Sequence, residues 1–73
     1  MSRRLAPRIG LPVEVAFLAA RVAGTVEDIG DGGRTVTVLT AEGELLAFRL
    51  NRVTGLFVSE DPHMRARLLP ARE

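Results

Sequence analysis

Two segments of this chain hold the residue types best suited to binding chemistry, an arginine-rich start and a later acidic, glycine-rich stretch. Arginine presents a planar, permanently charged fork that matches a phosphate group or the edge of guanine. A glycine-rich turn allows its backbone and a neighbouring carboxylate to approach a flat polar ligand closely. Together the two segments predict a nucleotide-binding surface. Its candidate residues are Arg3, Arg4, Arg8, Asp28, Gly30 and Gly33.

Residues suited to catalysis or to metal binding are scarce. The chain has no cysteine and one histidine, His63, which we expect to be a surface residue. Neither Ser2 nor Ser59 has a histidine placed to activate it, so nucleophilic catalysis lacks its base. The histidine and the acidic residues show no spacing typical of metal ligands. The sequence therefore predicts a protein that is not an enzyme and that uses no metal or cofactor.

The composition indicates one small globular domain. The chain has 73 residues, of which 47% are hydrophobic, and a formal net charge of +1. No apolar run approaches the roughly 20 residues that a membrane helix needs, and no secretory signal is visible. Since cysteine is absent as well, we expect a cytoplasmic protein that does not insert into a membrane.

The elements that must position the candidate residues are predominantly strands. Pro7 and Pro12 predict an extended arginine-rich arm over residues 1–12, because proline restricts the chain and lacks a backbone donor. Residues 13–73 then form one domain. Period-two patterns predict five strands, with a bend or bulge at Gly24 and a tight turn at 31–33. The predicted strands lie at 13–17, 22–29, 35–40, 45–50 and 53–58.

The end of the chain carries signals of a short helix. Asp61 is a suitable N-cap, and Pro62 suits the first helical position. Met64 and Leu68 are four residues apart, which gives an apolar edge, and Pro70 ends the pattern. The predicted fold is therefore all-β, a small, strongly bent five-stranded barrel with this C-terminal helix as a lid over its open end.

The order of these features resembles that of the PilZ family, small barrels that bind cyclic di-GMP. The arm sequence Arg4-Leu5-Ala6-Pro7-Arg8 fits the family's Arg-x-x-x-Arg motif. The stretch from Asp28 to Gly33 fits its Asp/Asn-x-Ser-x-x-Gly motif, with Gly30 in place of the serine. Gly55-Leu56-Phe57-Val58 and the predicted helix are similar to the family's closing strand and helix. The chain is shorter than the family's usual domain.

The resemblance implies a regulatory domain that binds a guanine dinucleotide, cyclic di-GMP, in bacterial signalling. The arginines of the arm would clamp the phosphates and the Hoogsteen edge of guanine, and Asp28 with the backbone of the turn would complete the pocket. Guanine offers two acceptors that one arginine fork can span. The missing serine hydroxyl would remove one hydrogen bond, a loss of about 0.5–1.5 kcal/mol.

Two alternatives remain open. The strand pattern with Gly24 in the second strand also resembles Sm-like barrels, in which the chain would form a ring and Arg49 and Arg52 would contact RNA phosphates. The chain has no tyrosine or tryptophan on which bases could stack. A protein-interaction module, with a partner protein or a second copy, would instead expose an apolar patch.

Overall fold

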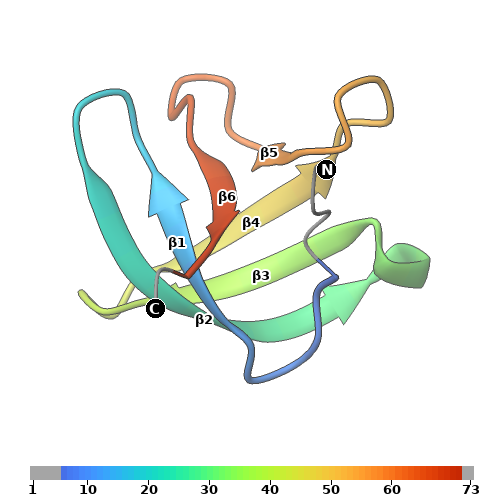
Figure 1. Cartoon of the computed structure of the whole chain (residues 1–73), viewed down its shortest axis with the longest axis horizontal. Helices are drawn as coiled ribbons and strands as arrows, with labels where there is room; N and C mark the ends of the chain where they lie inside the picture. Colours follow the sequence, from blue (N-terminus) through green and yellow to red (C-terminus); the bar gives the residue numbers. More distant parts are fainter. Residues whose placement is uncertain (1–5, 72–73) are drawn as a thin grey trace.

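Six antiparallel strands follow one another and close into a barrel in the computed structural model, which describes residues 6–71 (Figure 1). This confirms the prediction of an all-β barrel. A 3-10 turn, η1, covers Asp31–Gly33. The strands are β1 (Pro12–Ala16), β2 (Arg21–Gly30), β3 (Thr35–Thr40), β4 (Leu45–Leu50), β5 (Phe57–Ser59) and β6 (Arg67–Pro70).

Each strand pairs with the next in sequence, and β6 returns to pair with β1. The closing ladder runs from Val13 opposite Pro70 to Ala16 opposite Arg67. In contrast, β5 and β6 share one register pair, Val58 with Arg67. Closure pairs β1 with β6, the two strands that would be the edges of an open sheet.

The interior is filled by the alternate residues of the strands. Phe48, the largest fully buried side chain, lies in the middle of the barrel between Val36 on β3 and Ser59 on β5. Branched and aromatic side chains suit this pleated, half-buried surface. The buried hydrophobic cluster comprises Val13, Val15, Val26, Val36, Val38, Leu46, Phe48, Phe57, Ala66 and Leu68.

The predicted C-terminal helix over residues 61–69 is wrong, because the segment forms one turn and then a sixth strand. The capping signals act only locally, as the Met64 amide donates to the Asp61 carbonyl oxygen at 3.1 Å. Arg65 then has a φ of +50°, a left-handed conformation that ends the turn. Beyond it Ala66 and Leu68 are buried and Arg67 is exposed, the period-two pattern of a strand that pairs with β1.

The fifth predicted strand, 53–58, is also shorter than expected. The Asn51 side-chain oxygen accepts hydrogen bonds from the amides of Val53 and Thr54, at 2.9 and 3.2 Å. This Asx-type turn occupies the start of the predicted strand and leaves Val53 95% exposed. Strand β5 therefore begins only at Phe57. The barrel has six strands instead of the predicted five because β6 takes the place of the predicted helix.

The irregularity of β2 lies three residues after the predicted one. Gly24 pairs regularly with Thr40, and its missing Cβ makes room for Val38, whose Cγ1 would lie 2.6 Å from such an atom. The register shifts between Val26 and Asp28, which is a β-bulge at Glu27. The sequence signal for it is the pair of acidic residues between inward-facing Val26 and Ile29.

Candidate functional site

The described part of the arm is attached to β2. The Gly10 amide donates to the Val26 carbonyl oxygen at 2.8 Å, and the Val26 amide donates to the Leu11 carbonyl oxygen at 2.9 Å. These two bonds extend the β1–β2 ladder beyond Pro12. The Leu11 amide also donates to the Arg8 carbonyl oxygen at 3.0 Å, so the chain turns at Arg8 immediately before it meets β2. Arg8 itself is exposed.

The β-bulge next to this contact determines where Asp28 points. If β2 were regular here, strict alternation from buried Val26 would turn Glu27 outward and direct Asp28 into the barrel. With the bulge, Asp28 lies opposite Thr37 on the outer surface, and both Glu27 and Asp28 are exposed. The bulge thus places a carboxylate on the stretch of β2 that directly follows the attachment point of the arm.

Gly30 and Gly33 have structural reasons to be glycine. A Cβ on Gly30 would lie 2.9 Å from Thr35 Oγ1 across the β2–β3 connection. Gly33 has a φ of +92°, which glycine adopts without steric cost. The turn between them brings the Arg34 amide to the Asp31 carbonyl oxygen at 3.2 Å. This compact turn follows Asp28 directly.

The predicted residues that the structure describes therefore lie along one side of the barrel, which we call the arm face. It consists of Arg8–Leu11 of the arm and Val26–Gly33 of β2 and its turn (Figure 1). Within residues 6–71 no ion pair or side-chain hydrogen bond joins Arg8 to Asp28. Arg3 and Arg4 fall outside the described residues.

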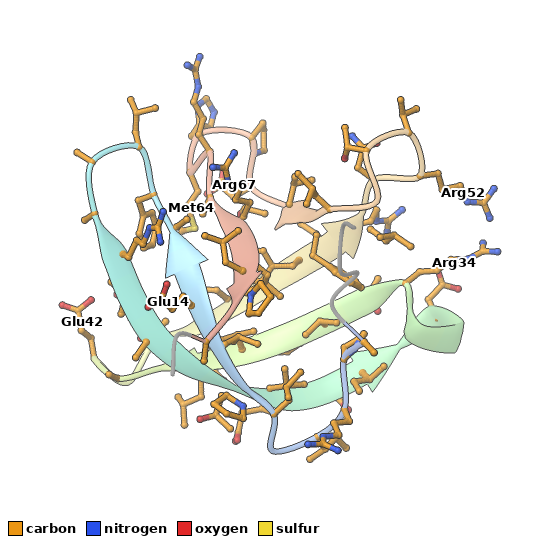
Figure 2. The ribbon with its side chains drawn as sticks, in the orientation of Figure 1. Glu14, Arg34, Glu42, Arg52, Met64 and Arg67 are labelled. Carbon is orange, nitrogen blue, oxygen red and sulfur yellow. The ribbon has the colours of Figure 1, made fainter. Side chains whose placement is uncertain are left out.

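The structure adds one arginine that sequence reasoning missed. The Leu50 amide donates to the Arg34 carbonyl oxygen at 2.8 Å, which brings the start of β3 beside the end of β4. Arg34 and Arg52 consequently extend from neighbouring segments and point away from the barrel on the same side (Figure 2). We call this region the arginine end. Pairing of the predicted strands 35–40 and 45–50 as a hairpin would have revealed it.

Arg49 differs from these two arginines. Its Nε lies 3.4 Å from Glu60 Oε1, and it lines an open hollow of about 530 Å³ together with Asn51 and Val58. The pair is exposed, so it contributes little to stability, but Glu60 offsets much of the positive charge locally. Within the described range, neither Arg34 nor Arg52 forms an ion pair.

Of the polar residues considered for catalysis, Ser59 and His63 lie in one hydrogen-bonded turn with Asp61, and Ser2 falls outside the described residues. The Ser59 hydroxyl accepts a hydrogen bond from the Asp61 amide at 3.1 Å, and Asp61 Oδ1 accepts one from the His63 amide at 3.0 Å. Residues 6–71 contain no group of three or more histidine, aspartate or glutamate side chains that could hold a metal ion. In the same part of the chain no helix is long and apolar enough to cross a membrane.

The chain matches no protein-family model, no curated protein and no solved structure.

Proposed function

We propose that this barrel is a regulatory domain that binds a guanine dinucleotide of the cyclic di-GMP type on the arm face. The observation that carries the proposal is the attachment of the arm to β2 at Val26, two residues before the outward-facing Asp28. This arrangement brings the segment that carries Arg8 next to an exposed carboxylate.

The chemistry of the two groups is complementary to guanine and its phosphates. An arginine fork on Arg8 can donate to N7 and O6 of guanine or to two phosphate oxygens. The Asp28 carboxylate can accept from the amino group on the other side of the base. Arg34, which directly follows Gly33, adds a third charged group at the edge of the same turn.

The test is calorimetric titration of the full chain with cyclic di-GMP. We expect saturable binding that weakens about tenfold or more in Arg8→Ala, which loses a charged donor, and in Asp28→Asn, which replaces a charged acceptor by a neutral one. Arg67→Ala on β6 is the matched control, because Arg67 is also exposed and lies outside the arm face. A flat trace with the unmodified chain, or equal losses in Arg8→Ala and Arg67→Ala, would overturn the proposal.

A second candidate, binding of single-stranded RNA, is favoured by the arginine end alone. Arg34 and Arg52 point into solvent on one side of the barrel, where they could contact successive phosphates (Figure 2). Phe48 and Phe57 are buried, so neither offers a stacking platform to the bases. Such binding would be electrostatic and would tolerate any sequence.

Fluorescence anisotropy with a labelled oligouridine at two salt concentrations distinguishes this candidate. It requires binding that falls steeply with salt and that weakens in Arg52→Ala. Under the dinucleotide proposal Arg52→Ala leaves cyclic di-GMP affinity unchanged, because Arg52 belongs to the loop after β4 and not to the arm face. The RNA candidate and the dinucleotide proposal can therefore be refuted independently of each other.

A further inference from the structure

The first half of β4 has an edge that its neighbour β5 does not cover. Strand β3 pairs with β4 from Leu45 to Arg49, but β5 pairs only with Phe48–Leu50. Figure 1 shows β5 alongside the arrowhead of β4 and apart from its start. We call residues 45–47 on this side the free edge. An open hollow of about 380 Å³ borders the free edge, and its far side is lined by Ser59, Glu60, Asp61 and Met64.

The backbone of β4 directs its hydrogen-bonding groups to alternate sides. The Thr40 amide donates to the Glu44 carbonyl oxygen at 2.8 Å, so Glu44 directs this group toward β3. Since successive residues of a strand direct their amide and carbonyl groups to opposite sides, the backbone groups of Leu45 and Ala47 point away from β3. These four groups therefore point toward the free edge.

Within residues 6–71, three of these four groups form no hydrogen bond. The Ala47 carbonyl oxygen accepts from the Glu60 amide at 3.0 Å. The Ala47 amide, the Leu45 amide and the Leu45 carbonyl oxygen have no partner in this range. The Leu45 side chain is 64% exposed, so the same edge carries uncovered apolar surface. An unpaired strand edge of this kind is a template for pairing with another chain.

The free groups are complementary to those of a second copy related by a two-fold axis at Leu45. In antiparallel pairing about this axis, the Leu45 amide of each copy donates to the Leu45 carbonyl oxygen of the other. The Ala47 amide then faces Gly43 of the second copy, a residue whose carbonyl oxygen accepts no hydrogen bond in the described part of the chain. A two-fold axis at Leu46 would instead need the Ala47 carbonyl oxygen, which Glu60 already uses. The free groups therefore favour one register.

Side chains and charges are compatible with this register. The exposed Leu45 side chains of the two copies lie next to each other across the axis, and their contact removes apolar surface from water. The acidic turns with Glu42 and Glu44 lie on opposite sides of the axis. The Gly43 residues of the two copies are separated by four residues along the strands, about 13 Å, which exceeds the Debye length at physiological salt. Repulsion between the two turns is therefore weak.

We propose that the free edge is the interface of a two-fold symmetric dimer of this chain. The two β4 strands pair antiparallel about Leu45 and join the two barrels through one continuous sheet. Strand β3 separates β4 from β2, so the interface leaves the arm face of each copy uncovered. The dimer forms whether or not the arm face binds a nucleotide.

Sedimentation equilibrium of the full chain from micromolar to millimolar concentration tests the proposal. We expect a monomer–dimer equilibrium that weakens about tenfold or more in Ala47→Pro and in Leu45→Lys. Proline at position 47 removes an amide that points away from β3, so the β3–β4 pairing remains intact. Lysine at position 45 places two like charges across the axis. Both variants should keep the far-ultraviolet circular dichroism spectrum of the unmodified chain.

Val53→Lys is the matched control for Leu45→Lys, since Val53 is 95% exposed in the loop after β4 and lies outside the free edge. It should leave the dimer unchanged. Hydrogen exchange identifies the interface, because the amides of Leu45 and Ala47 should exchange more slowly as the protein concentration increases.

Three results would overturn the proposal. The first is a monomer at every concentration. The second is a dimer that Leu45→Lys leaves intact, or one in which exchange at Leu45 and Ala47 does not depend on concentration, because the copies would then meet elsewhere. The third is a ring of three or more copies, since pairing about the two-fold axis is complete with two. If Ala47→Pro does not fold, Leu45→Lys alone decides.

Discussion

The arginine end and the opposite end of the same two strands, which we call the glutamate end, carry opposite charge. Arg34 precedes β3 and Arg52 follows β4, whereas Glu42 and Glu44 lie in the hairpin between these strands (Figure 2). Six residues of strand separate the two ends by roughly 20 Å. At that distance salt at physiological concentration largely screens one end from the other. The difference shows that one rigid ladder can present two independent surfaces.

The loops at the two ends are also held by different side-chain to backbone hydrogen bonds. At the arginine end the Asn51 side chain accepts hydrogen bonds from the amides of Val53 and Thr54. At the glutamate end the Thr40 hydroxyl, on a residue that is 5% exposed, accepts one from the Glu44 amide at 3.1 Å. Each end therefore has a side chain whose removal should loosen that end alone.

Loss of the core that both ends share should have the largest effect on the protein. Phe48→Ala deletes a fully buried ring and should destabilise the fold by about 3–5 kcal/mol, which is a large part of the stability of a small domain. Urea denaturation followed by far-ultraviolet circular dichroism measures the loss. A change below about 1 kcal/mol would mean that the barrel interior is not packed as described.

A more local change should affect the glutamate end first. Gly24→Ala places a Cβ 2.6 Å from Val38 Cγ1 and 3.1 Å from the Leu39 carbonyl oxygen, opposite the end of β3. Such overpacking costs about 1–3 kcal/mol. It should lower the melting temperature while leaving cyclic di-GMP binding intact at temperatures where the protein is folded.

Ala23→Val is the control for this variant, because Ala23 is an exposed neighbour on β2 with space for a larger side chain. Its melting temperature should remain close to that of the unmodified chain. If Gly24→Ala is as stable as Ala23→Val, the close approach of β2 and β3 at this position is wrong.

Removal of the Asn51 or the Thr40 side-chain acceptor should loosen one end and leave the other unchanged. Asn51→Ala and Thr40→Val should each cost about 1 kcal/mol, since each leaves backbone donors without a side-chain acceptor. Hydrogen exchange should accelerate at Val53 and Thr54 in the first variant and at Glu44 in the second. Faster exchange at both ends in either variant would show that the ends are coupled.

The smallest effect is expected for the exposed ion pair. Glu60→Gln removes the partner of Arg49 and should change stability by no more than about 0.5 kcal/mol. It should strengthen oligouridine binding slightly if the arginine end contacts RNA, because Arg49 then keeps its full charge. A large stability loss, measured by thermal unfolding, would contradict the exposed geometry of the pair.

Period-two patterns predicted the centre of the molecule well. The bounds 35–40 and 45–50 are those of β3 and β4, because each strand has an inner face of buried residues and a clear turn on either side. The helix prediction at 61–69 failed because capping rules describe one turn of chain, whereas the edge of β1 decides the rest. In this segment, pairing with β1 determines the secondary structure more strongly than the local capping residues do.

The candidate site was predictable only in part, for the same reason. Asp28, Gly30 and Gly33 were singled out from their order, but the bulge that turns Asp28 outward depends on pairing with β3. Arg34 was missed because its importance comes from contact with the end of β4. A prediction that pairs strands before it selects charged residues would recover both features.

The most direct test of the central claim is an amide chemical-shift titration of the full chain with cyclic di-GMP. We expect shifts at Gly10, Asp28 and Gly33 on the arm face, with Gly43 at the glutamate end unchanged. Shifts confined to Gly43 and its neighbours, or no shift anywhere at millimolar ligand, would contradict it.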